Sequence, residues 1–272
     1  MSTIKHLPLM STFSLTINHW TAWMPGITTG DDWLQWAVDE KHPTKECELP
    51  KVSEMPPMLR RRLSPIGKIA LYSAFSAVIH AQHKSVASIF CSRHGDLQRT
   101  VSLLKDLSYQ QPLSPAHFSL SVYNAIPGLM SIARKDNGSI TALACGQHDI
   151  ANVFIEAKGI MDEQGISEVL CVIYDEPIPD IYNLPQQHPA YSTAFLVSNT
   201  ATHIGGNTNN SHCQPVTLSF TIENAKEKPL ENDEPQALQL LRFLLQPQPL
   251  DLTLNGARNR WCCYKKPAKS DH

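Results

Sequence analysis

The stretch from Ser114 to Cys171 decides the fold of this chain. It opens with Ser114-Pro115-Ala116-His117-Phe118-Ser119-Leu120-Ser121-Val122-Tyr123-Asn124-Ala125-Ile126-Pro127-Gly128 and continues, after a polar turn, with Ser139-Ile140-Thr141-Ala142-Leu143-Ala144-Cys145-Gly146-Gln147-His148-Asp149-Ile150. The order is helix, strand, tight turn of small residues, helix and strand, which is typical of an α/β fold. In this layout the N–H groups and positive dipole end of the helix that follows the turn point at the turn, which is a place that can activate a nucleophile.

The composition excludes several classes of protein. The chain has 272 residues, of which 42% are hydrophobic, so it can bury a substantial core. Only 18% are charged, which predicts a partly apolar surface and hence a partner. The net charge of -2 gives no electrostatic case for nucleic acid. No apolar run approaches the ~18 residues of a membrane span, and Met1 to Met10 lacks the apolar core of a secretion signal.

The cysteines indicate a reducing compartment. The chain has seven of them at irregular spacings, several within apolar runs where a thiol acts as a small hydrophobe. We therefore expect a cytoplasmic protein. The sequence has no C-x-x-C pair, no H-E-x-x-H, no G-x-S-x-G elbow and no Walker or Rossmann glycine pattern, so we expect neither a metal nor a cofactor.

The periodicity of apolar residues predicts alternating helices and strands. Two expectations concern helix starts: Asp31-Asp32 caps a helix that begins at Trp33, and Ser64-Pro65 starts a long one. Pro127 should bend or break the helix over 119–132. The helix over 96–109 should face the core with the side chains of Leu97, Val101, Leu104 and Leu107. Strands are expected at 13–23, 86–91, 139–144, 168–174, 194–198, 216–222 and 250–254, and further helices at 148–162 and 234–245.

The stretch that opens this section resembles the N-terminal half of a β-ketoacyl synthase, one of the thiolase-like condensing enzymes. Those enzymes carry Ser-Pro-x-Phe, then Asn-x-x-x-Gly, then a strand that runs into Thr-Ala-Cys-x-x-Gly, where Cys is the nucleophile. The matching positions here are Ser114-Pro115, Asn124 with Gly128, and Thr141-Ala142-Leu143-Ala144-Cys145-Gly146. The resemblance covers roughly residues 10 to 200 and is strongest at 114–150. It implies an α/β, thiolase-like layered fold, as one domain over 10–272, with a reduced C-terminal half. The position of residues 265–272 at the end of the chain predicts a disordered tail.

The resemblance places Leu143 at the position of the nucleophile. A leucine side chain cannot form a thiolate or accept an acyl group. The His-Gly-Thr and Asn-His motifs that carry the catalytic histidines of the family are absent after residue 175. The relatives that share these absences are chain-length factors, and within that class the chain is most similar to the short type linked to aryl polyene biosynthesis.

A chain-length factor has no condensing activity of its own. The resemblance implies that this chain forms a heterodimer with an active β-ketoacyl-ACP synthase, which supplies the Cys and the His pair. The complex would receive acyl carrier protein and perform a decarboxylative condensation. This chain would complete the fold of its partner and shape the acyl tunnel.

The resemblance also assigns roles to particular residues, each with a simpler alternative. The strand of Ser139 to Leu143 would pair antiparallel with a strand of the partner. The dimer interface would then be formed by Ser139, Ile140, Thr141, Ala142, Leu143 and Asn124. The alternative is that this strand lies in the interior of a single chain. His117, Phe118 and Val122 would face the tunnel, or else only pack at the interface. The carrier protein would contact Arg60, Arg61 and Arg62. The favoured alternative is that these arginines form only a solvated basic turn before a helix.

Cys145 supports a hypothesis of another class. Near a helix N-terminus its thiol could have a lowered pKa and act as the nucleophile of a self-sufficient acyltransferase. The favoured interpretation is an inert, buried thiol, with Leu143 filling a vestigial pocket or serving as plain core. A further hypothesis is a homodimeric scaffold that only binds carrier protein.

Overall fold

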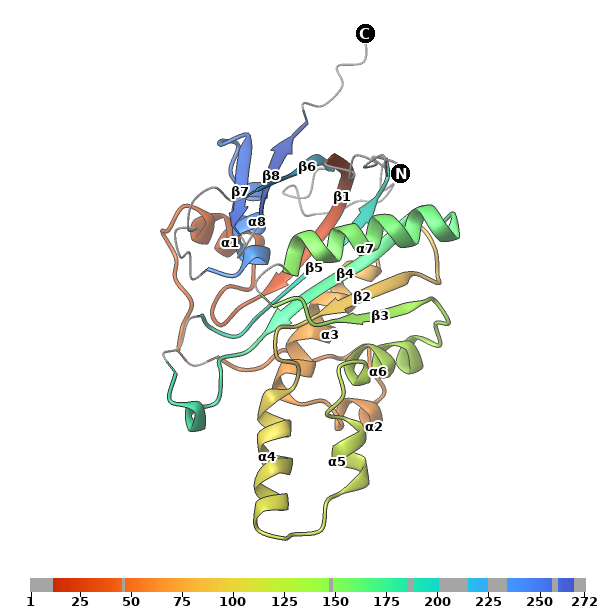
Figure 1. Ribbon diagram of the computed structural model, residues 1–272, viewed down its shortest axis with the longest axis vertical. Coiled ribbons are helices and arrows are strands. Elements are labelled where there is room, and N and C mark those ends of the chain that lie inside the picture. The colour runs from red at the N-terminus through yellow and green to blue at the C-terminus, as the bar shows by residue number, and fades with distance from the viewer. Residues whose placement is uncertain are drawn as a thin grey trace, which may run out of the picture.

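The computed structural model describes residues 12–45, 47–146, 149–184, 188–200, 215–224, 234–255 and 259–266. Its strands form one eight-stranded sheet in the order β3-β2-β4-β5-β1-β6-β8-β7 (Figure 1). The strands are β1 Thr12–Trp23, β2 Ala87–Cys91, β3 Ile140–Leu143, β4 Glu168–Asp175, β5 Tyr191–Ser198, β6 Val216–Asn224, β7 Asp251–Asn255 and β8 Asn259–Lys265. The predicted α/β class is confirmed.

The helices lie on both faces of this sheet. They are α1 Gly30–Ala37, α2 Pro57–Arg60, α3 Pro65–Val78, α4 Leu97–Ser108, α5 Pro115–Ser119, α6 Ala125–Arg134, α7 Asp149–Gln164 and α8 Gln236–Leu245, with a 3-10 turn, η1, at Asp180–Tyr182. No helix among the described residues is long and apolar enough to cross a membrane.

The part of the sheet that matters for function is parallel. β2 pairs in parallel with β3 on one side and with β4 on the other. β5 is antiparallel to β4, and β1 is antiparallel to β5. The carboxyl ends of β2, β3 and β4 therefore meet at one edge of the sheet, where ligand sites of α/β sheets usually lie.

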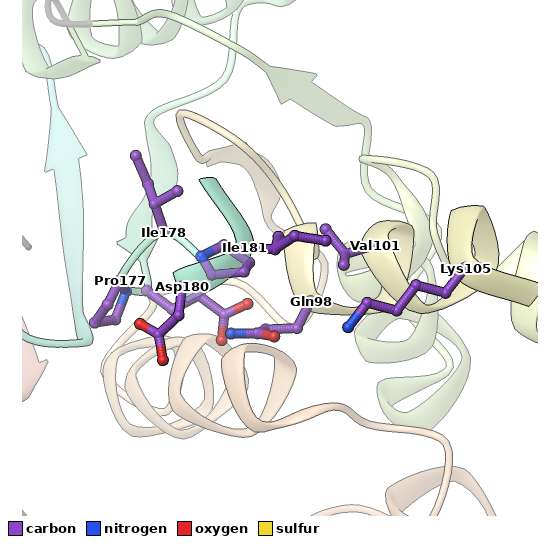
Figure 2. A pocket seen from close by; sticks show the side chains of 9 residues that line it. Gln98, Val101, Lys105, Pro177, Ile178, Asp180 and Ile181 are labelled. Carbon is purple, nitrogen blue, oxygen red and sulfur yellow. The ribbon is translucent and has the colours of Figure 1, made fainter. Parts of the chain in front are cut away.

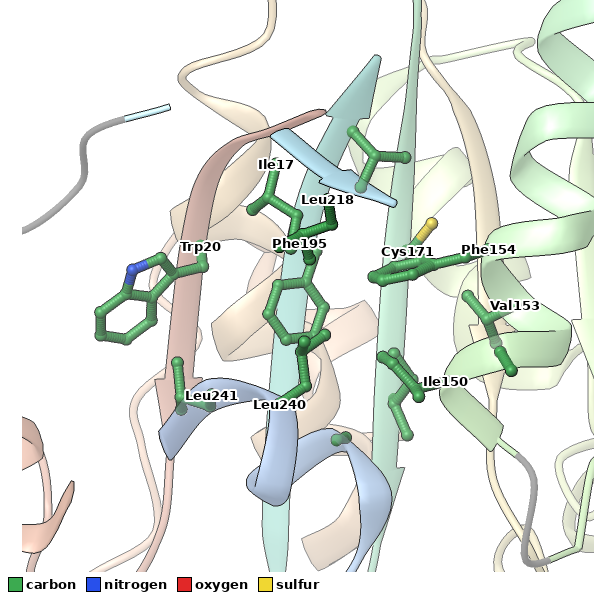
Figure 3. Packing of buried hydrophobic residues seen from close by; sticks show 14 of the residues in the cluster. Ile17, Trp20, Ile150, Val153, Phe154, Cys171, Phe195, Leu218, Leu240 and Leu241 are labelled. Carbon is green, nitrogen blue, oxygen red and sulfur yellow. The ribbon is translucent and has the colours of Figure 1, made fainter. Parts of the chain in front are cut away.

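Two apolar clusters hold the layers together. Residues of α1, α7 and α8 form one cluster with the sheet, and residues of α3 and α6 form the other cluster on the opposite face. In the first cluster, the ring of Phe154 lies edge-on to that of Phe195, with centroids 5.9 Å apart (Figure 3). The ring of Phe220 lies edge-on to Phe154 at 5.6 Å. Each such side chain contributes about 1.5–3 kcal/mol when it is buried. This packing fixes α7 on the sheet.

Local signals explain two of the helix starts. Ser64 is the N-cap of α3, as predicted, and its Oγ accepts a hydrogen bond of 3.3 Å from the N–H of Gly67. The prediction for α1 was wrong, because Thr29 is the N-cap and Asp32 lies inside the helix. Thr29 Oγ accepts from the Asp32 N–H, and the Asp32 carboxylate accepts from the Thr29 N–H, which is a capping box.

Two predictions for 96–132 need correction. The chain breaks between α5 and α6, and Pro127 lies in the first turn of α6, where a missing N–H costs no helical hydrogen bond. On α4, Val101 and Leu103 are buried, but Leu104 and Leu107 are 54% and 58% exposed. The apolar stripe of α4 is therefore wider than the face that this chain covers.

The last strand was not predicted. β8 pairs with both β6 and β7 and so extends the sheet instead of starting a second one. Lys265 ends β8, and its N–H donates to the carbonyl of Leu250 at 2.9 Å. The rest of the predicted tail, residues 267–272, lies outside the described residues.

Two histidine rings lie against each other, tilted by 34°. His19 on β1 is buried, and its ring centroid lies 3.8 Å from that of His80, just after α3. Burial, and then the charge of His80, lower the pKa of His19 from 6.5 to about 4.

Acid should therefore destabilise the fold through His19. The unfolded chain takes up this proton at about pH 6.5 and the folded chain only at about pH 4. The contribution to the free energy of unfolding is complete above pH 6.5 and falls by about 3 kcal/mol as the pH drops towards 4. Urea titrations measure the free energy of unfolding at pH 7.5 and at pH 4.5. The difference between the two values should be smaller for His19→Phe than for wild type. Substitution of the exposed His42 should leave the difference unchanged, and equal differences for all three proteins would contradict the assignment.

Candidate functional site

The turn after β3 lies where the sequence places it. Leu143 is the last residue of β3, is half-buried and packs against the cluster on the α7 face of the sheet. Gly146 has a φ of +62°, a conformation that favours glycine and turns the chain towards α7. The side chain in the position predicted for a nucleophile is thus a hydrocarbon.

Cys145 differs from the buried thiol that was predicted. Its side chain is half-buried and packs against the same cluster as Leu143. Hydrogen bonds with the thiol of Cys91 and with Asn152 lower the pKa of Cys145, and they outweigh burial and the charge of Glu156, which raise it. Cys145 is therefore more exposed than the neighbouring thiol of Cys91, and its lowered pKa favours the reactive thiolate.

β3 forms an edge of the sheet. Among the described strands it pairs only with β2: the N–H of Ser88 donates to the carbonyl of Ser139 at 2.9 Å, and the N–H of Ser92 donates to Leu143 at 3.3 Å. Because peptide groups alternate along a strand, the N–H and C=O of Ile140 and Ala142 point away from β2. The backbone of β3 is in a position to accept another strand, as the interface prediction requires.

A helical hairpin, residues 97–123, stands out from the sheet beside this edge. α4 and α5 run next to each other and project below the strands (Figure 1). Large apolar side chains that are more than a third exposed follow its whole length; they are Leu104, Leu107, Tyr109, Leu113, Phe118, Val122 and Tyr123. Such a concentration marks a protein-binding or ligand-binding surface.

The residues predicted to face a tunnel lie on or just after α5. His117 and Phe118 are exposed, Phe118 to 61%, and Val122 is exposed to 46%. Ser114 holds the start of α5, because its Oγ accepts from the N–H of His117 at 3.3 Å. Asn124 is the N-cap residue of α6 and is exposed, with no capping hydrogen bond from its side chain.

The structure brings His117 together with two of the three predicted arginines. A hollow of about 510 Å³ lies between the turn before α3 and α5, and Arg61, Arg62, Arg99 and His117 line it. Arg60 is not part of this lining; its guanidinium instead donates to the carbonyl of Val52 at 3.4 Å. The hollow is basic, so an acidic surface would fit it.

Sequence analysis missed a group of polar side chains at the carboxyl ends of β2 and β4. The hydroxyl of Ser92 and the N–H of Arg93 donate to the buried carboxylate of Asp175, at 2.8 and 2.9 Å. Glu176 follows Asp175. The available signal was the pair of acidic residues directly after a buried strand. No group of three His, Cys, Asp or Glu side chains in the described part of the chain is arranged to hold a metal.

Comparison with known proteins identifies the family. Residues 33–263 match the model of the β-ketoacyl synthase N-terminal domain. The chain belongs to this family. No curated protein sequence matches the chain significantly.

Solved structures of this family's fold are similar over most of the chain. A chain of the ketosynthase ApeO in complex with its chain length factor ApeC, from Xenorhabdus doucetiae, is 26% identical, with a TM-score of 0.76; the match covers 93% of this chain and 99% of that one. The ishigamide ketosynthase/chain length factor is 12% identical, with a TM-score of 0.59 and coverage of 78% and 67%. The type II polyketide complex of AntDE with the acyl carrier protein AntF is 11% identical, with a TM-score of 0.60 and coverage of 79% and 70%. The last two show the fold alone.

The cysteines of this family member should differ in reactivity. In the native protein at pH 7.5, iodoacetamide should alkylate Cys145 at least about ten times faster than Cys171 and Cys263, because burial raises the pKa of those two thiols. Peptide mass spectrometry after timed quenching measures the rates. The exposed Cys47 checks the reagent, and protection of Cys145 equal to that of Cys171 would overturn the assignment.

Proposed function

We propose that this chain is a non-catalytic chain-length-factor subunit that pairs with an active β-ketoacyl-ACP synthase. The observation that carries the proposal is Leu143, a hydrocarbon side chain at the end of β3, in a chain that belongs to the family of the synthases. The near-complete mutual coverage with a chain of the ApeO–ApeC complex supports it, because that chain has about the same length as this one.

The chemistry of condensation would come from the partner. A condensing enzyme needs a thiolate to hold the acyl group and histidines to assist decarboxylation of the malonyl thioester. Position 143 offers no thiol, and the histidine motifs of the family are absent after residue 175. These two absences are independent, so restoring a cysteine at one position would not restore activity.

The proposed partner face combines the edge of β3 with the helical hairpin. A strand of the synthase would pair antiparallel with β3 through the outward peptide groups of Ile140 and Ala142, and Asn124 would lie at the same interface. The exposed leucines and aromatic rings of residues 97–123 would supply the apolar area. Obligate interfaces bury on the order of 2,000 Å² or more in total.

His117, Phe118 and Val122 are the candidates for shaping the acyl tunnel. They are exposed in this chain alone, so a partner that covers the hairpin would bury them. Bulky side chains at the far end of a tunnel would limit the length of the growing chain in polyene or polyketide-type synthesis. Arg61 and Arg62 in the basic hollow are the candidates for contact with an acidic acyl carrier protein, and Arg60 contributes less directly.

A second candidate function rests on Cys145. Its half-exposed thiol with a lowered pKa would suit a self-sufficient acyltransferase. The same experiment separates the two functions.

The first test is co-purification with the ketosynthase. With a tag only on this chain, we expect a one-to-one complex whose condensation activity survives Cys145→Ala in this chain and disappears when the partner's cysteine is removed. Leu143→Cys in this chain should not produce activity in the absence of the partner. Activity of this chain alone, lost on Cys145→Ala, would favour the acyltransferase instead.

The second test addresses the edge of β3. Ala142→Pro removes an N–H that points away from β2, so the fold should lose less than about 1 kcal/mol while the yield of complex falls at least about tenfold. Thr141→Pro is the matched control, because its N–H faces β2 and its loss should destabilise the chain itself by about 1–3 kcal/mol. Thermal unfolding and pull-down yields measure both effects. Normal assembly of Ala142→Pro would exclude β3 as the pairing strand.

A further inference from the structure

Two thiols meet where β2 ends. Cys91 is the last residue of β2 and is fully buried, and in the parallel register it pairs with Leu143, the last residue of β3. Cys145 lies two residues beyond Leu143, and a hydrogen bond joins its thiol to that of Cys91. Both thiols pack in the apolar cluster on the α7 face of the sheet. The function proposed above makes no use of this pair.

The two thiols differ in their access to solvent. Cys145 is half-buried, whereas Cys91 has no exposed surface. A cavity of about 360 Å³ lies between the first turns of α4 and the segment that follows β4 (Figure 2), but neither cysteine lines it. A small reagent that arrives from solvent therefore meets the sulfur of Cys145, and the sulfur of Cys91 lies behind it.

The surroundings of Cys145 favour its reactive form. The thiol of Cys91 and the side chain of Asn152 form hydrogen bonds with Cys145 and lower its pKa, against the opposing effects of burial and of Glu156. The thiolate is the form of cysteine that peroxides oxidise. The hydrogen bond between the two sulfurs also keeps a second thiol next to the one that reacts, which is the arrangement of a redox-sensitive cysteine with a resolving partner.

We propose that Cys145 and Cys91 form a reversible disulfide when a hydroperoxide oxidises Cys145. The Cys145 thiolate attacks one peroxide oxygen, the O–O bond breaks, and the hydroxide that leaves takes up a proton to form water. Cys145 is then a sulfenic acid. The sulfur of Cys91 attacks the sulfur of Cys145, the S–O bond breaks, and the departing hydroxide takes the Cys91 proton as a second water. Two thiols are oxidised and one hydrogen peroxide is reduced.

The backbone around Cys145 permits the approach that this bond needs. The sulfurs of a disulfide are about 2.05 Å apart, closer than two hydrogen-bonded thiols. Cys145 lies between the end of β3 and the turn at Gly146, outside the ladder of β2 and β3. The hydrogen bond from the N–H of Ser92 to Leu143 comes before it in the chain, so a shift of Cys145 leaves that bond in place. The disulfide would tie the turn before α7 to the end of β2.

The test uses the free chain, with Cys47→Ser and Cys213→Ser in every protein so that neither thiol forms a competing disulfide. Cys47 is exposed, and Cys213 lies outside the described residues. After brief exposure to hydrogen peroxide at pH 7.5, free thiols are blocked in denaturant and the unreduced chain is digested with trypsin. We expect the peptides over 85–93 and 136–158, each with one cysteine, to be joined, and a dithiol reductant to separate them. This linked pair should exceed any other pair at least about tenfold.

Replacement of each cysteine should stop the reaction at a different stage. Cys91→Ala should leave Cys145 as a sulfenic acid, which dimedone traps, and Cys145→Ser should leave Cys91 reduced because solvent does not reach it. Asn152→Ala should slow the linkage about threefold, because it removes a hydrogen bond that favours the thiolate. Cys262→Ala is the matched control, since it removes a buried thiol of β8 and should leave the linkage unchanged. Thermal unfolding checks that each variant is folded.

Two results would overturn the inference. One is sulfenic acid at Cys145 without the linked peptide in the chain that keeps Cys91, and the other is oxidation of Cys91 at the same rate in Cys145→Ser. Both are read without Cys91→Ala, so they decide the matter even if that variant does not fold. None of these measurements uses the ketosynthase, so their outcome is separate from that of the proposed assembly.

Discussion

The hydrogen bonding of β3 is the constraint on which the proposed assembly depends. Each peptide group of a strand has a donor and an acceptor, and the groups of Ile140 and Ala142 face away from β2. An edge of this kind must be left to water or covered by another strand. The helical hairpin beside it exposes leucines and aromatic rings that its own chain does not cover. The proposed partner would account for both features by covering this side of the molecule with one protein surface.

The proposed loss of the family's chemistry is compatible with the fold, because the contacts that hold the layers together do not involve position 143. The packing of Phe154, Phe195 and Phe220 holds α7 on the sheet, and Gly146 permits the turn before it. None of these contacts needs a reactive group at position 143. Leu143 adds apolar contact to the core, so the proposed loss of the nucleophile at this position would leave the geometry of the turn unchanged.

The parallel strands concentrate charge at one edge of the sheet. β2 and β4 both end there, and the segments that follow them bring Asp96, Asp175 and Glu176 close together. Arg99 and the donors of residues 92–93 satisfy two of these carboxyl groups, and Glu176 accepts a hydrogen bond from the backbone N–H of Gln98.

The sequence by itself determined the features that arise from local spacing, which are the amphipathic α7, the buried β4 and the Ser64 cap. It misplaced the break near Pro127, because a proline in the first turn of a helix looks like one inside it until the start of the helix is known. Periodicity also could not tell that Leu104 and Leu107 face outward, since an apolar stripe has the same spacing whether it meets its own core or a partner. Only the tertiary structure decided that β8 extends the sheet and that Arg61, Arg62 and His117 share a hollow. It alone brought the thiol of Cys91 to that of Cys145, because such contacts join residues far apart in the chain.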